Sequence, residues 1–69
     1  FMSELTIQFG QLVRKYRTER NISQVQLALL CNMYRIYLGR IERGEVNPTL
    51  EKIYELAIAL DMHPSSFLP

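Results

Sequence analysis

The chain has 69 residues, a formal net charge of +1 and a single cysteine. A chain this short forms only a marginal hydrophobic core, which favours one tightly packed helical domain over residues 1–69 or stabilisation by a partner. The lone cysteine excludes an internal disulfide and fits the reducing cytoplasm. Because no run of about 18 apolar residues occurs, we expect neither a membrane span nor a charged-then-apolar leader.

The charges are unevenly distributed along the chain. Residues 1–43 hold seven of the eight Lys and Arg residues and three of the seven acids, whereas residues 44–69 hold one lysine and four acids. This asymmetry predicts one basic face suited to phosphates and an opposite face that is acidic.

Apolar residues near the N-terminus recur with the period of a helix and predict a first helix that ends near Arg20. Asn21 and Ile22 then break this helix. The stripe expected to face the core consists of Leu5, Phe9, Leu12, Val13 and Tyr16.

Residues 24–43 have the pattern of two short crossed helices joined by a turn. Ser23 and Gln26 form a capping box that starts the first of these helices. Ala28 is small enough for the second helix to cross closely, and Asn32 tolerates the left-handed conformation that the turn needs. The inner faces of the two helices are predicted to carry Leu27, Cys31, Met33, Leu38 and Ile41.

The rest of the chain predicts two more helical segments. Gly44 is suited to the C-terminus of the helix over 34–43. Thr49 starts a fourth helix, and Pro64 starts a last short turn of helix that bears Phe67 and Leu68. The inward residues of the fourth helix are predicted to be Leu50, Ile53, Leu56, Ala57 and Leu60.

Three linked motifs carry a family resemblance. They are Ser-Gln-x-x-Leu-Ala at 23–28, Ile-Glu-Arg-Gly at 41–44 and Asn-Pro-Thr-Leu at 47–50. In this order they resemble the Cro/repressor-type family of small bacterial and phage regulators, and most of all the controller proteins of restriction-modification systems. The resemblance implies an all-α fold, the compact five-helix lambda-repressor-like domain, often paired into a two-fold dimer.

The resemblance also implies a sequence-specific DNA-binding transcriptional regulator that places the helix over 34–43 in the major groove of double-stranded DNA. Arg35 and Arg40 then project outward, where either side chain can donate two hydrogen bonds to a guanine, and Ile36 can contact a thymine methyl. Positions that correspond to phosphate contacts are Gln24, Arg43, Asn47 and Thr49.

Two further roles follow from the same resemblance. Arg17 and Glu42 correspond to an ion pair that braces the first helix against the third. A homodimer is expected, in which residues near the C-terminus bury against a symmetry mate. These residues are Met62, Phe67 and Leu68.

Several apolar residues depart from the polar pattern of the family on the outer surface of the second and third helices. They are Val25, Leu29, Tyr34 and Ile36. One explanation is ordinary drift with an unusual operator. The other is that the face has been engineered or repurposed to bind a protein or a second copy, because Tyr and Arg around an apolar centre are typical of interfaces.

The sequence lacks the residue sets that catalysis and metal binding require. No nucleophile, base and orienting group stand in a recognisable set, so an enzyme is not expected. His63 is the only histidine, and no Cys, His or acidic ligands accompany it at metal spacing, so neither a metal nor a cofactor is expected. Cys31 is interpreted as a small apolar filler of the core.

Overall fold

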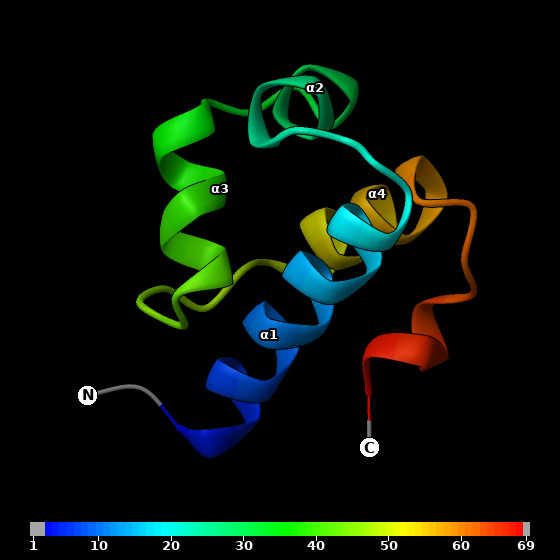
Figure 1. Cartoon of the computed structure of the whole chain (residues 1–69). Helices are drawn as coiled ribbons and strands as arrows, with labels where there is room; N and C mark the ends of the chain where they lie inside the picture. The colour runs from blue at the N-terminus through cyan, green and yellow to red at the C-terminus, as the bar shows by residue number, and fades with distance from the viewer. Residues whose placement is uncertain (1–2, 69) are drawn as a thin grey trace.

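Within residues 3–68, four α-helices follow one another, and one turn of 3₁₀ helix follows the fourth (Figure 1). The computed structural model describes residues 3–68. The elements are α1 (Glu4–Glu19), α2 (Gln24–Leu30), α3 (Arg35–Glu42), α4 (Leu50–Ala59) and η1 (Pro64–Phe67). The all-α prediction is confirmed, with a single 3₁₀ turn as its fifth element.

Side-chain caps explain where three of the helices begin. Ser3, Ser23 and Thr49 each accept a hydrogen bond from a backbone N–H of the first turn of α1, α2 and α4. The predicted capping box is complete, because Gln26 also accepts from the N–H of Ser23 at 2.8 Å. The cap of α3 is Tyr34, which makes no side-chain cap hydrogen bond. Helix α3 therefore lacks the side-chain cap that α1, α2 and α4 have.

Residues with a left-handed backbone end the helices. Asn21, Asn32 and Asp61 have φ values of 56°, 52° and 56°, and Gly44 follows α3 with φ of 73°. Asn32 confirms the predicted reversal between α2 and α3. Gly44 also needs to be glycine for space, because an added Cβ would lie 2.9 Å from the Cα of Ile7.

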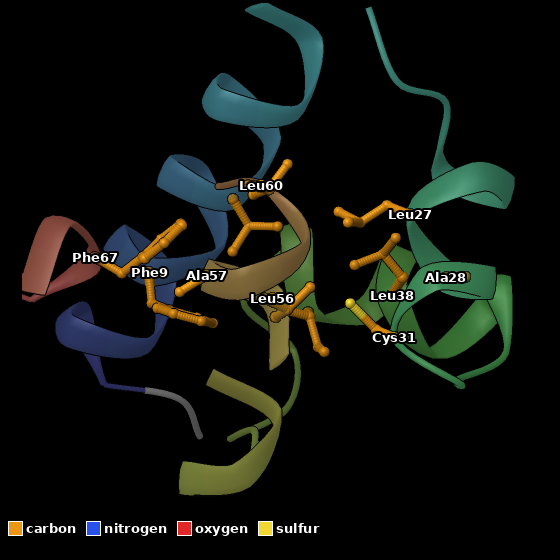
Figure 2. Packing of buried hydrophobic residues seen from close by; sticks show 11 residues of the cluster. Phe9, Leu27, Ala28, Cys31, Leu38, Leu56, Ala57, Leu60 and Phe67 are labelled. Carbon is orange, nitrogen blue, oxygen red and sulfur yellow. The ribbon is translucent and has the colours of Figure 1, made fainter. Parts of the chain in front are cut away.

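The core lies where α1, α2, α3 and α4 meet, and η1 closes one side of it (Figure 2). The Phe67 ring reaches back from η1, with its centroid 5.7 Å from Phe9 and 5.3 Å from Tyr16. At the crossing of α1 and α3, a Cβ on Gly10 would collide with the Ile41 carbonyl oxygen. The buried apolar residues are Phe9, Val13, Leu27, Ala28, Cys31, Leu38, Ile41, Leu56, Ala57, Leu60 and Phe67.

The prediction of an inward-facing side chain is wrong for two residues, and both lie in the first turn of a helix. Leu5 is 50% exposed on α1 and Leu50 is 68% exposed on α4. In the first turn of α1 the buried residue is Thr6 instead, and its hydroxyl donates to the Asn47 side-chain oxygen. Among residues 3–68, no helix combines the length and the apolar character needed to cross a membrane.

Candidate nucleic-acid interface

Helix α3 has one face in the core and one face in solvent. Leu38 and Ile41 are fully buried in the core, where α3 packs against α1 and α2, and they fix the helix by its inner side. The three residues predicted to read bases lie on the opposite side, where Arg35, Ile36 and Arg40 are all exposed. The sequence therefore folds so that α3 presents two guanidinium groups and an aliphatic group outward on one short helix.

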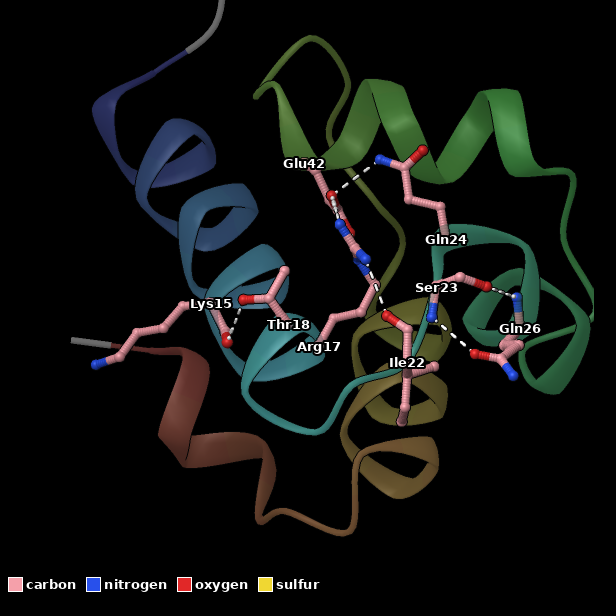
Figure 3. A network of polar contacts seen from close by, with 8 residues as sticks. All are labelled: Lys15, Arg17, Thr18, Ile22, Ser23, Gln24, Gln26 and Glu42. Carbon is pink, nitrogen blue, oxygen red and sulfur yellow. Dashed lines mark hydrogen bonds and ion pairs between the residues drawn. The ribbon is translucent and has the colours of Figure 1, made fainter.

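A buried ion pair braces α3 against α1 and the start of α2 (Figure 3). Arg17 Nε lies 2.6 Å from Glu42 Oε2, Arg17 Nη2 donates to Oε1 at 3.0 Å, and Nη1 donates to the Ile22 carbonyl at 2.9 Å. Gln24 donates to the same Oε1 at 3.0 Å. The Glu42 side chain is only 2% exposed, so the hydrogen bonds from Arg17 and Gln24 offset the cost of burying its charge. The predicted ion pair is confirmed.

Two of the residues predicted to contact phosphates meet above Gly39. A Cβ at Gly39 would lie 3.2 Å from Arg43 Nη1 and 3.8 Å from Gln24 Oε1. The missing side chain thus leaves room for Gln24, from the start of α2, and Arg43, from the end of α3, to share one side of the helix. Gln24 uses one amide hydrogen on Glu42 and keeps the other free to donate.

Glu45 places an acid among these basic residues, and the sequence reasoning did not single it out. Its carboxylate accepts from Arg43 Nε at 2.7 Å and Nη2 at 3.4 Å, and it lies 3.8 Å from Arg40 Nε. The hydrogen bond from Arg43 lowers the pKa of Glu45, and the same bond raises the pKa of Arg43. The signal in the sequence was an acidic residue directly after the helix-ending Gly44.

The other two residues predicted to contact phosphates, Asn47 and Thr49, make hydrogen bonds that stabilise the fold. Asn47 accepts the hydrogen bond from Thr6, and the Thr49 hydroxyl accepts from the Lys52 N–H at 3.2 Å to cap α4. Both side chains are exposed. Each retains a donor, the Asn47 amide hydrogens and the Thr49 hydroxyl hydrogen, that a phosphate oxygen could accept.

The apolar departures from the family pattern all face solvent, as predicted. Val25, Leu29, Tyr34 and Ile36 are 50%, 76%, 86% and 68% exposed. Leu29 and Tyr34 also line one hollow at the α2–α3 turn, of about 490 Å³. Leu30, which the sequence reasoning did not consider, adds to the exposed apolar surface at 65%.

The predicted dimer residues do not form one exposed surface. Phe67 is 1% exposed and packs on Phe9 and Tyr16 of its own chain, so the prediction that it buries against a second copy is wrong. Its position one turn after Pro64 folds the ring inward to close the core. Leu68 remains 48% exposed and Met62 is partly buried.

The remaining reactive groups are used in packing. Cys31 is 3% exposed with its Sγ 3.6 Å from the Glu55 carbonyl oxygen, which confirms its interpretation as a core filler. Burial, followed by the charge of Glu55, raises the pKa of its thiol. His63 caps η1 by accepting from the Ser65 N–H at 3.1 Å. In the described part of the chain, no three His, Cys, Asp or Glu residues are grouped to hold a metal.

Relatives of known type share both the sequence and the fold. The chain is 37% identical over 67 residues to control protein C.BamHI of Bacillus amyloliquefaciens, which covers 96% of this chain and 83% of the relative. It is 47% identical over 49 residues to control protein C.SmaI of Serratia marcescens, covering 71% of this chain and 58% of the relative.

The solved structure of the restriction-modification controller protein C.AhdI from Aeromonas hydrophila superposes with a TM-score of 0.88 at 41% identity, covering 91% of this chain and 96% of that one. A family model described as helix-turn-helix matches residues 13–67, a span that includes α2, α3, the brace at Glu42 and the closing turn η1. With these matches and the crossed helices that present Arg35 and Arg40, the chain belongs to the helix-turn-helix family of Cro/repressor type.

Proposed function

We propose that this protein is a sequence-specific DNA-binding transcriptional regulator that inserts α3 into the major groove of double-stranded DNA. The observation that carries the proposal is the presentation of α3, whose inner face is locked in the core while its outer face displays Arg35, Ile36 and Arg40. A helix of this diameter fits the major groove, where each base pair has a distinct pattern of donors and acceptors. The controller relatives support the same function.

The proposed roles divide between base reading and positioning. Arg35 and Arg40 donate to guanine edges and Ile36 contacts a thymine methyl, so these residues carry sequence preference. Gln24 and Arg43 bind phosphates on the flank of α3, where they meet above Gly39. Phosphate contacts are also proposed for the donors that remain on Asn47 and Thr49.

The exposed apolar residues of α2 and α3 fit within this function. Tyr34 and Ile36 stand at the start of α3. In this motif the N-terminal residues of the recognition helix contact base edges in the major groove. Apolar groups there are suited to thymine methyls, and family membership favours DNA over a protein target for this face. Such a regulator works where the DNA is, so we place it in the cytoplasm of a bacterial cell.

We further propose that the chain forms a single domain and that two copies pair into a two-fold homodimer. Of the residues first expected at the interface, Met62 and Leu68 remain accessible and Phe67 is excluded by its burial. A two-fold pair sets two α3 helices about 34 Å apart, which is one turn of DNA. Sedimentation of wild type and Leu68→Glu tests this arrangement. Dissociation by the variant supports the interface, and a wild type that stays monomeric at high micromolar concentration contradicts it.

Selection from a random DNA library tests the function directly. The full chain should recover a two-fold related site, and its affinity for that site should fall steeply as salt rises. The triple variant with Val25→Glu, Tyr34→Asp and Ile36→Ser should keep the fold and change the preferred bases. Recovery of no preferred sequence by wild type, in low salt, would refute the proposal.

A further inference from the structure

A groove runs between α1 and the end of α3, beside the residues assigned to DNA above. It encloses about 490 Å³. Arg43, a proposed phosphate contact, forms one wall, while the exposed side chains of α1 form the other. We name this hollow the α1–α3 groove, and it is lined by Ile7, Gln11, Arg14, Lys15, Thr18, Glu42 and Arg43.

The charge in the α1–α3 groove is positive once its ion pairs are considered. Glu42 is the only acid that lines it, and this carboxylate is already held by Arg17 and Gln24. Within residues 3–68, no carboxylate lies within 4.0 Å of the Arg14 guanidinium. Arg14 is exposed, so it offers an uncompensated fork of N–H donors to whatever enters the groove.

The neighbouring Lys15 directs its charge elsewhere. Its Nζ lies 5.5 Å from the centroid of the Tyr16 ring, which packs against Phe67 on the side of η1. Figure 3 shows the lysine side chain extending away from Glu42. Lys15 therefore lines the α1–α3 groove with its stem, and Arg14 supplies the charge from α1. Two adjacent residues of equal charge thus differ in where that charge points.

We propose that the α1–α3 groove binds a phosphate of the DNA backbone beyond those held by Gln24 and Arg43, with Arg14 as its principal ligand and Gln11 as a neutral donor. This inference rests on the proposed function, because the occupant is the same duplex that α3 reads. The groove is continuous with that surface, since Arg43 belongs to both. A guanidinium can donate to two phosphate oxygens at once, which fits Arg14 as the principal ligand.

The experiment compares Arg14→Gln with Lys15→Gln in the full chain. Affinity is measured by fluorescence anisotropy over a series of NaCl concentrations, on the selected duplex and on a scrambled duplex of equal length. Arg14→Gln should weaken both complexes by about fivefold and reduce the salt slope by about one. Lys15→Gln removes the same charge one residue away and should change affinity by less than about twofold. Arg14→Lys should restore most of the lost affinity, because a phosphate accepts a point charge.

The outcomes separate this inference from the function beneath it. If wild type shows no salt-sensitive affinity for either duplex, the proposed function fails and the groove assignment with it. If wild type binds but Arg14→Gln matches Lys15→Gln, or loses affinity for the selected duplex alone, only the groove assignment is overturned. Saturable binding of inorganic phosphate to the free protein, lost in Arg14→Gln with no change in the DNA salt slope, would assign the groove to a small anion and also overturn it.

Discussion

Arg43 and Glu45 form a bidentate pair at the end of the recognition helix, with Nε 2.7 Å from Oε2 and Nη2 3.4 Å from Oε1. A carboxylate presents the same oxygen geometry to a guanidinium as a phosphate does. Glu45 therefore occupies the donors that Arg43 would offer to DNA, and it adds a negative charge near a polyanion.

Replacing this carboxylate should strengthen DNA binding. Glu45→Gln is expected to raise affinity by about twofold to fivefold on every sequence, since an exposed ion pair of modest strength no longer competes for Arg43. Glu51→Gln serves as the control, because Glu51 is an exposed acid in the first turn of α4 and loses the same charge. Equal gains for the two variants in a filter-binding assay would mean that only net charge matters.

Base reading and phosphate contact should respond differently to truncation. Arg35→Ala or Arg40→Ala is expected to cost about 1–3 kcal/mol and to relax preference at one base pair, because a bidentate guanine contact is lost. Arg43→Ala should weaken all duplexes alike and flatten the salt dependence. Competition binding with single-base operator variants measures both effects, and uniform losses in all three proteins would contradict the role assignment.

The brace between Arg17 and Glu42 should be a large contributor to stability. Arg17→Met leaves the nearly buried Glu42 carboxylate with one remaining side-chain donor. The free energy of unfolding is therefore expected to fall by about 3–5 kcal/mol. The double variant with Glu42→Met should recover much of this loss, because it removes the unpaired charge. Urea unfolding followed by circular dichroism measures both. An unchanged midpoint for Arg17→Met would show that the carboxylate is hydrated in solution.

The raised pKa of the Cys31 thiol predicts that the free energy of unfolding depends on pH in the alkaline range. Its pKa is raised in the folded chain by burial and by Glu55, so the unfolded thiol ionises first. The contribution is complete below the ordinary thiol pKa and is lost as pH rises through the folded value, at up to about 1.4 kcal/mol per pH unit. The difference in thermal unfolding between wild type and Cys31→Ala should therefore shrink in that window. A constant difference would show that the thiol does not titrate with folding.

Local signals predicted the backbone well because each one acts within a few residues. The capping box of Ser23 and Gln26, the left-handed Asn32 and the cap at Thr49 are all present where the sequence indicated them. Core residues in the middle of helices were also predicted, because the helical period determines which side faces inward. The prediction that Leu50 faces inward was wrong, because the side chain lies in the first turn of α4, outside the core.

The site was less predictable because its contacts depend on the folded path of the backbone. The fork of Arg43 on Glu45 depends on how Gly44 turns the backbone, and the convergence of Gln24 and Arg43 depends on a missing side chain at Gly39. Phe67 was assigned to a dimer surface from the family resemblance, but an apolar side chain can be buried equally well in the core of its own chain. Only the direction of η1 distinguishes the two.

The three hydrogen bonds that Arg17 and Gln24 donate to Glu42 have a consequence for the thermodynamics of recognition. If α3 swung about the α2–α3 turn, the Glu42 carboxylate would lose Arg17 or Gln24 while still largely excluded from water. The reading helix is therefore ordered before DNA arrives, and its conformational entropy is already lost during folding. Calorimetry should accordingly give a heat-capacity change on binding that matches rigid docking of two preformed surfaces, without the extra decrease that accompanies folding of a disordered segment.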